Sequence, residues 1–130
     1  MISQLDIAEL FARLAGLLDE QRYDEVHTVY AEDVVAHSPR GETRGLAEVI
    51  ALLKRSHVEG ERTQHVHSDV LVPLDGDRAK ASANGITYFY RAGEPPYRTS
   101  GLHVDWTLLR TPAGWRVSTS RIALAWMREE

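Results

Sequence analysis

In the first half of the chain, apolar residues recur every three or four positions, the spacing of helices that bury one face. The pattern predicts a helix from about Gln4 to Asp19 and, after a polar break, a shorter one from about Tyr23 to Tyr30. A brief apolar run at residues 34–37 predicts a short strand, and a third helix is expected over residues 46–56. The inward positions of the first helix are expected to be Leu5, Ala8, Phe11, Ala12, Ala15 and Leu18.

From Thr63 onward the period changes to two, which is the spacing of half-buried strands. Four long strands are predicted, at about residues 63–73, 78–91, 97–110 and 115–126. Turn residues such as Asp75-Gly76-Asp77 separate them, and such short links favour antiparallel neighbours. Helices followed by strands predict an α+β fold, with a curved antiparallel sheet wrapped as a cone around three N-terminal helices. A concave sheet of this kind offers a pocket at its mouth.

Composition narrows the functional classes. A length of 130 residues with 43% hydrophobic residues suits one domain spanning residues 1–130. The absence of cysteine excludes disulfides, thiolate zinc sites and a cysteine nucleophile. A net charge of -4 with scattered Lys and Arg makes nucleic acid an unexpected partner. With neither a leader-like start nor a long apolar run, no membrane association is expected and the cytoplasm is the default location.

The richest chemistry lies in the segment from Arg62 to Val72, at the start of the sheet. His65, His67 and Asp69 would share one face of a regular strand, and histidine exchanges protons readily near neutral pH. These residues could instead bind a metal, with a further ligand from His37 or His103, or be ordinary strand residues.

Strand parity adds two constraints. On the third long strand, Leu102, Val104, Trp106 and Leu108 share one face, so His103 and Asp105 are expected to point outward. In the central segment, Val66, Val70 and Val72 share a parity that opposes His65, which contradicts an inward His65. A bulge in a strongly curved strand could reset that parity.

Five stretches, at residues 18–25, 30–35, 44–46, 62–65 and 109–117, resemble the SnoaL-like branch of the nuclear-transport-factor-2-like superfamily. That group includes polyketide cyclases, ketosteroid isomerases and scytalone dehydratase, and the resemblance implies its cone-shaped, cystatin-like α+β barrel. It also implies that Asp19, at a helix end, and His65, in the Thr-Gln-His stretch, act as a hydrogen-bonded acid/base pair. Where dehydratases carry a further histidine or aspartate on the next strand, this chain has Ile86, Tyr88, Phe89 and Tyr90.

The resulting hypothesis is a cofactor-free lyase, isomerase or cyclase that acts on a small, largely apolar carbonyl or polyketide-like compound. His65 would transfer the proton, Asp19 would orient its ring, and Tyr88 or Tyr90 would donate to a developing oxyanion. The pocket wall is expected to include Phe11, Leu14, His37, Val104 and Trp106. No metal is expected. The protein is expected to form a homodimer through the outer face of the sheet. The alternative is a non-catalytic ligand-binding or structural subunit of the same fold.

Overall fold

The first helix buries a different stripe from the one expected. The structure, a computed structural model, describes residues 2–130, with side chains from residue 4 onward. Helix α1, Ile2–Asp19, matches the predicted segment, but Leu5 and Ala12 are exposed. The stripe of larger side chains faces the sheet because it removes more apolar area from water. Its members are Ile7, Leu10, Phe11, Leu14 and Leu17.

The second helix is shorter and tighter than predicted. It is a 3-10 helix, η1, Tyr23–Thr28, in which Val29 N donates to the carbonyl of Val26. Tyr30 already belongs to the first strand, because Val117 N donates to Val29 O and draws the chain into the sheet. Helix α2, Leu46–Ser56, lies where the sequence predicts it. Among residues 2–130, no helix has the length and apolar character needed to span a membrane.

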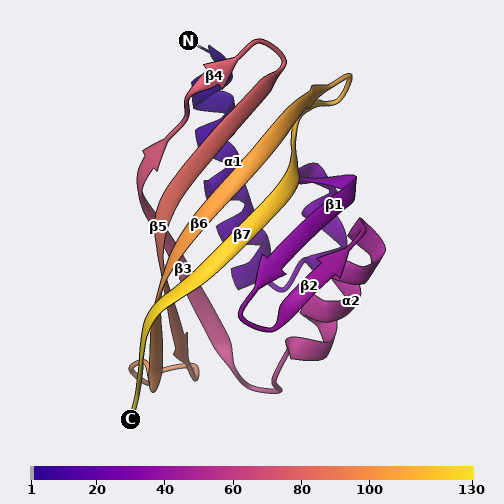
Figure 1. Cartoon of the computed structure of the whole chain (residues 1–130). Helices are drawn as coiled ribbons and strands as arrows, with labels where there is room; N and C mark the ends of the chain where they lie inside the picture. Colours follow the sequence, from indigo (N-terminus) through magenta and orange to yellow (C-terminus); the bar gives the residue numbers. More distant parts are fainter. Residues whose placement is uncertain (1) are drawn as a thin grey trace.

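The sheet is mixed and open. Its strands are β1 Tyr30–Ser38, β2 Gly41–Arg44, β3 Arg62–Leu71, β4 Leu74–Asp75, β5 Arg78–Tyr90, β6 Arg98–Thr111 and β7 Gly114–Glu129. They are ordered β2-β1-β7-β6-β5-β3, with β4 beside β5 (Figure 1). The expected antiparallel meander holds from β3 to β7, but β1 runs parallel to β7. The curved sheet stays open, as the predicted open-mouthed cone requires, with β2 and β3 as its edges.

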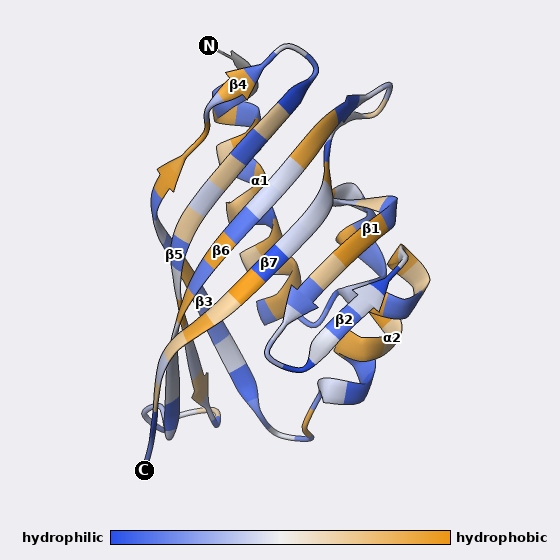
Figure 2. Ribbon diagram, in the orientation of Figure 1, coloured by the Kyte–Doolittle hydropathy of each residue, from blue (hydrophilic) through white to orange (hydrophobic). Residues whose placement is uncertain are grey.

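Helix α1 covers the concave face of the long strands, while β1, β2 and α2 lie at one side (Figure 1). Phe11 of α1 stacks on Trp106 of β6, with ring centroids 3.8 Å apart and planes 4° apart. Figure 2 shows hydrophobic residues alternating with polar ones along β5 and β6, as one buried face per strand requires. These contacts fill the interior between helix and sheet with side chains.

A bulge in β3 resolves the parity conflict. The pairing of β3 with β5 shifts between Ser68 and Leu71, and Asp69 has a φ of 55°. Before the bulge, His65 and His67 face the concave side; after it, Val70 packs against the core instead. The expectation that Asp69 shares a face with the two histidines is therefore wrong, since the extra residue reverses the alternation.

Candidate acid/base site

Asp19 and His65 form a hydrogen-bonded pair where α1 ends beside β3. His65 Nδ1 lies 2.6 Å from Asp19 Oδ1, and His65 N donates to Asp19 Oδ2 over 3.0 Å. Thr63 Oγ1 donates to Asp19 Oδ1 over 3.0 Å. The helix end places the carboxylate, and β3 presents a backbone N–H, a hydroxyl and a ring nitrogen to it. The aspartate is therefore held by the same strand that carries the histidine.

This geometry assigns the ring nitrogens. An ionised carboxylate only accepts hydrogen bonds, so Nδ1 of His65 carries the hydrogen that faces Asp19. In the neutral ring Nε2 is then the unprotonated nitrogen, which can accept a proton from a bound molecule. Asp19 thus fixes both the orientation and the tautomer of His65.

His65 lines an open cavity of about 300 Å³. The His65 side chain is 20% exposed, so the ring is reachable without lying in bulk solvent. The apolar part of the wall comprises Leu18, Leu53, Val58 and Phe89. A cavity of this volume lies at the lower end of the range for small-molecule sites, which suits a ligand of one or two rings.

The rest of the wall carries charge. Glu61 is 10% exposed, and its carboxylate accepts a hydrogen bond from the hydroxyl of Tyr97. Arg98 Nη2 lies 3.7 Å from Glu61 Oε2, and the guanidinium carbon lies 4.0 Å from the centre of the Phe89 ring. Arg40, from the turn between β1 and β2, also lines this cavity. The lining is therefore more polar than the sequence suggests.

Tyr23 supplies a hydroxyl to the same cavity. Burial raises the pKa of Tyr23 above its ordinary value, and the nearby Glu61 carboxylate adds to this effect. The phenol therefore keeps its proton at physiological pH and is available as a hydrogen-bond donor.

The two tyrosines expected near the site lie elsewhere. The structure turns Thr87 and Phe89 inward, opposite Ser100 and Arg98 of β6. By alternation, Tyr88 and Tyr90 project from the other face, and neither lines the cavity that holds His65.

The five residues expected to bind substrate do not line this cavity either. Phe11, Leu14, Val104 and Trp106 are buried in the core between α1 and the sheet. They face inward as predicted, but they pack against one another because the helix fills the hollow. His37 instead lies 3.4 Å from Glu42 on the neighbouring strand β2.

The residues considered as metal ligands are divided between the two faces of the sheet. His67 packs against Phe11 with ring centroids 5.3 Å apart, and Asn84 donates to Asp69 Oδ2 over 2.9 Å. His103 projects from the outer face as predicted and lies 3.3 Å from Asn84 Oδ1. Among residues 2–130, no three His, Asp or Glu side chains gather as ligands for one ion.

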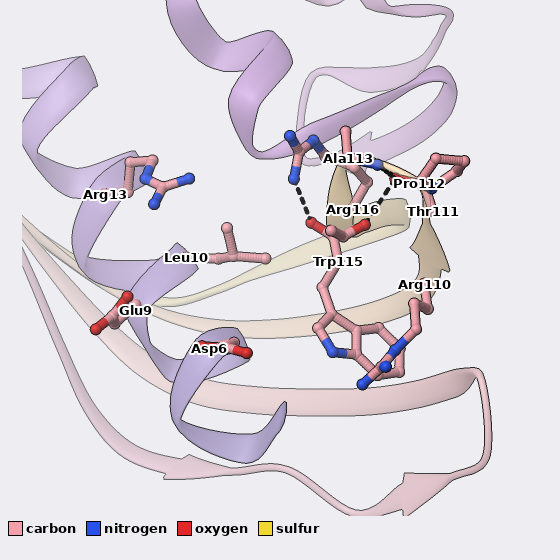
Figure 3. Close-up of a pocket in the computed structure, with 11 residues that line it drawn as sticks. Asp6, Glu9, Leu10, Arg13, Arg110, Thr111, Pro112, Ala113, Trp115 and Arg116 are labelled. Carbon is pink, nitrogen blue, oxygen red and sulfur yellow. Dashed lines mark hydrogen bonds between the residues drawn. The ribbon is translucent and has the colours of Figure 1, made fainter. Parts of the chain in front are cut away.

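A larger cavity, of about 540 Å³, lies at the other end of α1 (Figure 3). It is bordered by Arg13 of the helix and by the β6–β7 turn, where Arg116 Nη1 donates to the carbonyl of Trp115 over 2.8 Å. Neither Asp19 nor His65 borders it. Its lining contains no histidine, so the candidate site is the smaller cavity that His65 lines.

Sequence reasoning missed Tyr23, Arg40, Glu61 and Arg98. Arg98 could have been found by pairing β5 with β6, since it lies opposite Phe89. The other three come from turns and from the 3-10 helix, where periodicity carries no directional signal.

Comparisons with known proteins agree with this architecture. The family model of the SnoaL-like domain matches residues 2–121. A hexachlorocyclohexane dehydrochlorinase, LinA type 2, superposes with a TM-score of 0.87 at 11% identity, covering 99% of this chain and 89% of the other. The Kfla4162 protein of Kribbella flavida gives a TM-score of 0.88 at 20% identity, with 98% and 93% coverage.

An NTF2-like protein with a cystatin-like fold from Novosphingobium aromaticivorans gives a TM-score of 0.79 at 26% identity. The similarity covers 95% of this chain and 82% of that one. The search of curated proteins found no match. With its helices, its open curved sheet and this match over most of its length, the chain belongs to the SnoaL-like domain family of the NTF2-like superfamily.

Proposed function

We propose that this protein is a cofactor-free lyase, isomerase or cyclase that abstracts a proton next to a carbonyl. The observation that carries the proposal is the 2.6 Å contact between His65 Nδ1 and Asp19, beside a cavity that His65 lines. A carboxylate that fixes the tautomer of a reachable imidazole is the arrangement a general base requires. The substrate would be a small ring-containing carbonyl or polyketide-like compound.

In the proposed reaction, His65 Nε2 removes a proton from the carbon next to the carbonyl. The electron pair of the broken C–H bond moves onto the carbonyl oxygen and leaves an enolate, while the imidazolium is stabilised by Asp19. Return of the proton to another carbon gives isomerisation. Transfer to a departing hydroxyl gives elimination of water, and attack of the enolate carbon on a second carbonyl gives cyclisation.

Tyr23 is the hydroxyl best placed to donate to the enolate oxygen. It lines the cavity with His65, whereas Tyr88 and Tyr90 do not. A hydroxyl aimed at developing charge in a partly dry site can contribute several kcal/mol to the barrier, roughly 3 kcal/mol for one donor. The role first assigned to Tyr88 or Tyr90 therefore passes to Tyr23 in this proposal.

The fold comparison supports an elimination as one form of this chemistry. LinA is by name a dehydrochlorinase, so a protein of this fold removes hydrogen and chloride from a ring compound. At 11% identity the likeness supports the scaffold, and the reaction assigned here rests on Asp19 and His65.

The test is exchange of carbon-bound hydrogen. Cyclic ketones such as 1-tetralone would be incubated with the protein in D2O, and loss of the α-hydrogen signal followed by NMR. The wild type should accelerate exchange, and His65→Gln should reduce the acceleration by roughly 10²- to 10⁴-fold. His103→Gln, on the outer face, is the matched control and should keep the wild-type rate. Equal rates for His65→Gln and wild type would eliminate the mechanism.

One observation favours a second candidate, a non-catalytic binding or structural subunit. Phe11 and Trp106 fill the interior that a deep substrate pocket would need. This alternative predicts that ligands bind at the open cavity without any exchange. Exchange that depends on His65 would exclude it.

A further inference from the structure

Proton transfer by Asp19 and His65 leaves the charged side of the cavity unexplained. The charged residues that line the cavity are Arg40, Glu61 and Arg98. Two of these groups are guanidiniums and one is a carboxylate, so this side of the cavity carries an excess positive charge; the Asp19 carboxylate does not line the cavity and is hydrogen-bonded to Thr63 and His65. A hollow with an excess positive charge attracts an anion.

Arg98 is held in place without its donors being used. Phe89, its cross-strand partner, supports the guanidinium from 4.0 Å. Glu61 lies 3.7 Å from Nη2, which is longer than the roughly 2.7–2.9 Å of a charge-assisted hydrogen bond. Glu61 therefore balances part of the charge and leaves the donors of Arg98 available.

One donor in particular lacks an acceptor. Arg98 Nε is buried and has no hydrogen-bond partner within the described residues. Buried donors are nearly always paired in native proteins, so an unpaired guanidinium nitrogen beside the cavity fits an acceptor that a bound molecule supplies. A carboxylate fits the planar donor fork of arginine because it accepts two parallel hydrogen bonds.

Arg40 adds a second cation at the edge of the cavity. Its side chain donates to Ser56 Oγ at the end of α2, which ties the turn between β1 and β2 to the helix. Arg40 is exposed to solvent, so it would help to attract an anion to the cavity but would add little to the affinity once the anion is bound.

We propose that the substrate is a carboxylate attached to a ring, and that Arg98 binds this carboxylate while His65 acts on the adjoining carbon framework. The inference rests on the proposed function for the reaction, but not for the binding. The proposed substrate is thus a cyclic or aromatic keto acid, whereas the sequence predicted a largely apolar compound. Phe89 would contribute to binding both the carboxylate and the ring of the substrate, because it supports the guanidinium and presents apolar surface to the cavity.

The experiment compares two probes of nearly equal shape, 2-naphthoate and 2-naphthamide, by isothermal titration calorimetry. The wild type should bind the naphthoate at least about tenfold more tightly, since a hydrogen bond to a charged group contributes roughly ten- to hundredfold in affinity. Arg98→Gln should lose this preference and keep its affinity for the amide. Arg78→Gln, which removes a positive charge at the far end of β5, is the control and should retain it.

Arg98→Lys guards against a folding artefact, because it retains a cation beside Glu61 but lacks the planar fork. It should fold as the wild type does and bind the naphthoate with intermediate affinity. The proposal is overturned if the wild type does not prefer the naphthoate, or if Arg98→Gln keeps the preference. Because calorimetry measures affinity and the D2O assay measures proton transfer, failure here and failure of the His65 mechanism are separate results.

Discussion

Replacing Asp19 with asparagine should destabilise the whole domain as well as the site. Within the described residues, the carboxylate accepts from Thr63 Oγ1, His65 N and His65 Nδ1. An asparagine of the same shape offers one oxygen in place of two and directs an NH2 group at the remaining donors. The end of α1 would then lose part of its attachment to β3.

The magnitude follows from the exposure of the pair. A hydrogen bond to a charged acceptor contributes roughly 1.5–3 kcal/mol, and the 24% exposure of the Asp19 side chain reduces that because water replaces part of the loss. We expect Asp19→Asn to lower the free energy of unfolding by about 2–4 kcal/mol in total. For 130 residues this corresponds to a fall in Tm of roughly 7–15 °C.

Urea denaturation followed by circular dichroism measures this loss, and a thermal melt gives the Tm. Thr63→Val is the matched control: it removes one donor without changing shape and should cost about 1 kcal/mol. A Tm for Asp19→Asn within about 2 °C of the wild type would show that the carboxylate does not hold α1 to β3.

Three further predictions concern the titration of the buried His67, the packing of Phe11 on Trp106, and a dimer interface on the outer face of the sheet. Burial, and secondly the His65 ring, lower the pKa of His67. This histidine therefore has no pH-linked effect on stability well above its unfolded pKa, and it destabilises the folded state increasingly as pH falls below about 6.5. His67→Leu should flatten that decline in urea titrations at pH 5 and 8. Phe11→Ala should reduce the free energy of unfolding by roughly 3–5 kcal/mol, because it removes the ring stacked on Trp106, and an unchanged urea midpoint would refute that packing. We propose that a homodimer forms through the outer face of the sheet, where Val66 is 44% and Trp126 48% exposed. Val66→Lys should shift the mass measured by light scattering from that of a dimer to that of a monomer. A monomeric wild type would contradict this proposal.

Much of the site geometry could not be predicted because it depends on which strands meet. Parity placed His103 on the outer face and Trp106 on the inner face; the His103 side chain is exposed, whereas Trp106 is packed in the core and does not line the cavity expected of it. The same parity placed His65 on the wrong face until the bulge at Asp69 was visible. A bulge depends on the curvature of the whole sheet. The alternation of residues along one strand therefore indicates where a bulge is needed but does not show that the bulge occurs.

The charged wall illustrates the same limit. Arg98 contacts Phe89 across the β5–β6 pair and Glu61 in the loop before β3. Both residues are separated from Arg98 along the chain. Helical spacing likewise predicted α1 but not which of its two apolar stripes would be buried. That choice follows from the larger area that Ile7, Leu10 and Phe11 remove from water against the sheet.

The sequence by itself determined the succession of helices and strands, the absence of cysteine chemistry and the pairing of Asp19 with His65 through resemblance, since these depend on local period and residue type. Only the tertiary structure decided that the hollow under α1 is filled, that the cavity lies beside His65, and that Arg98 and Tyr23 line it. Those features arise where segments distant in the chain compete for the same buried space, and side-chain volume and cross-strand register settle that competition.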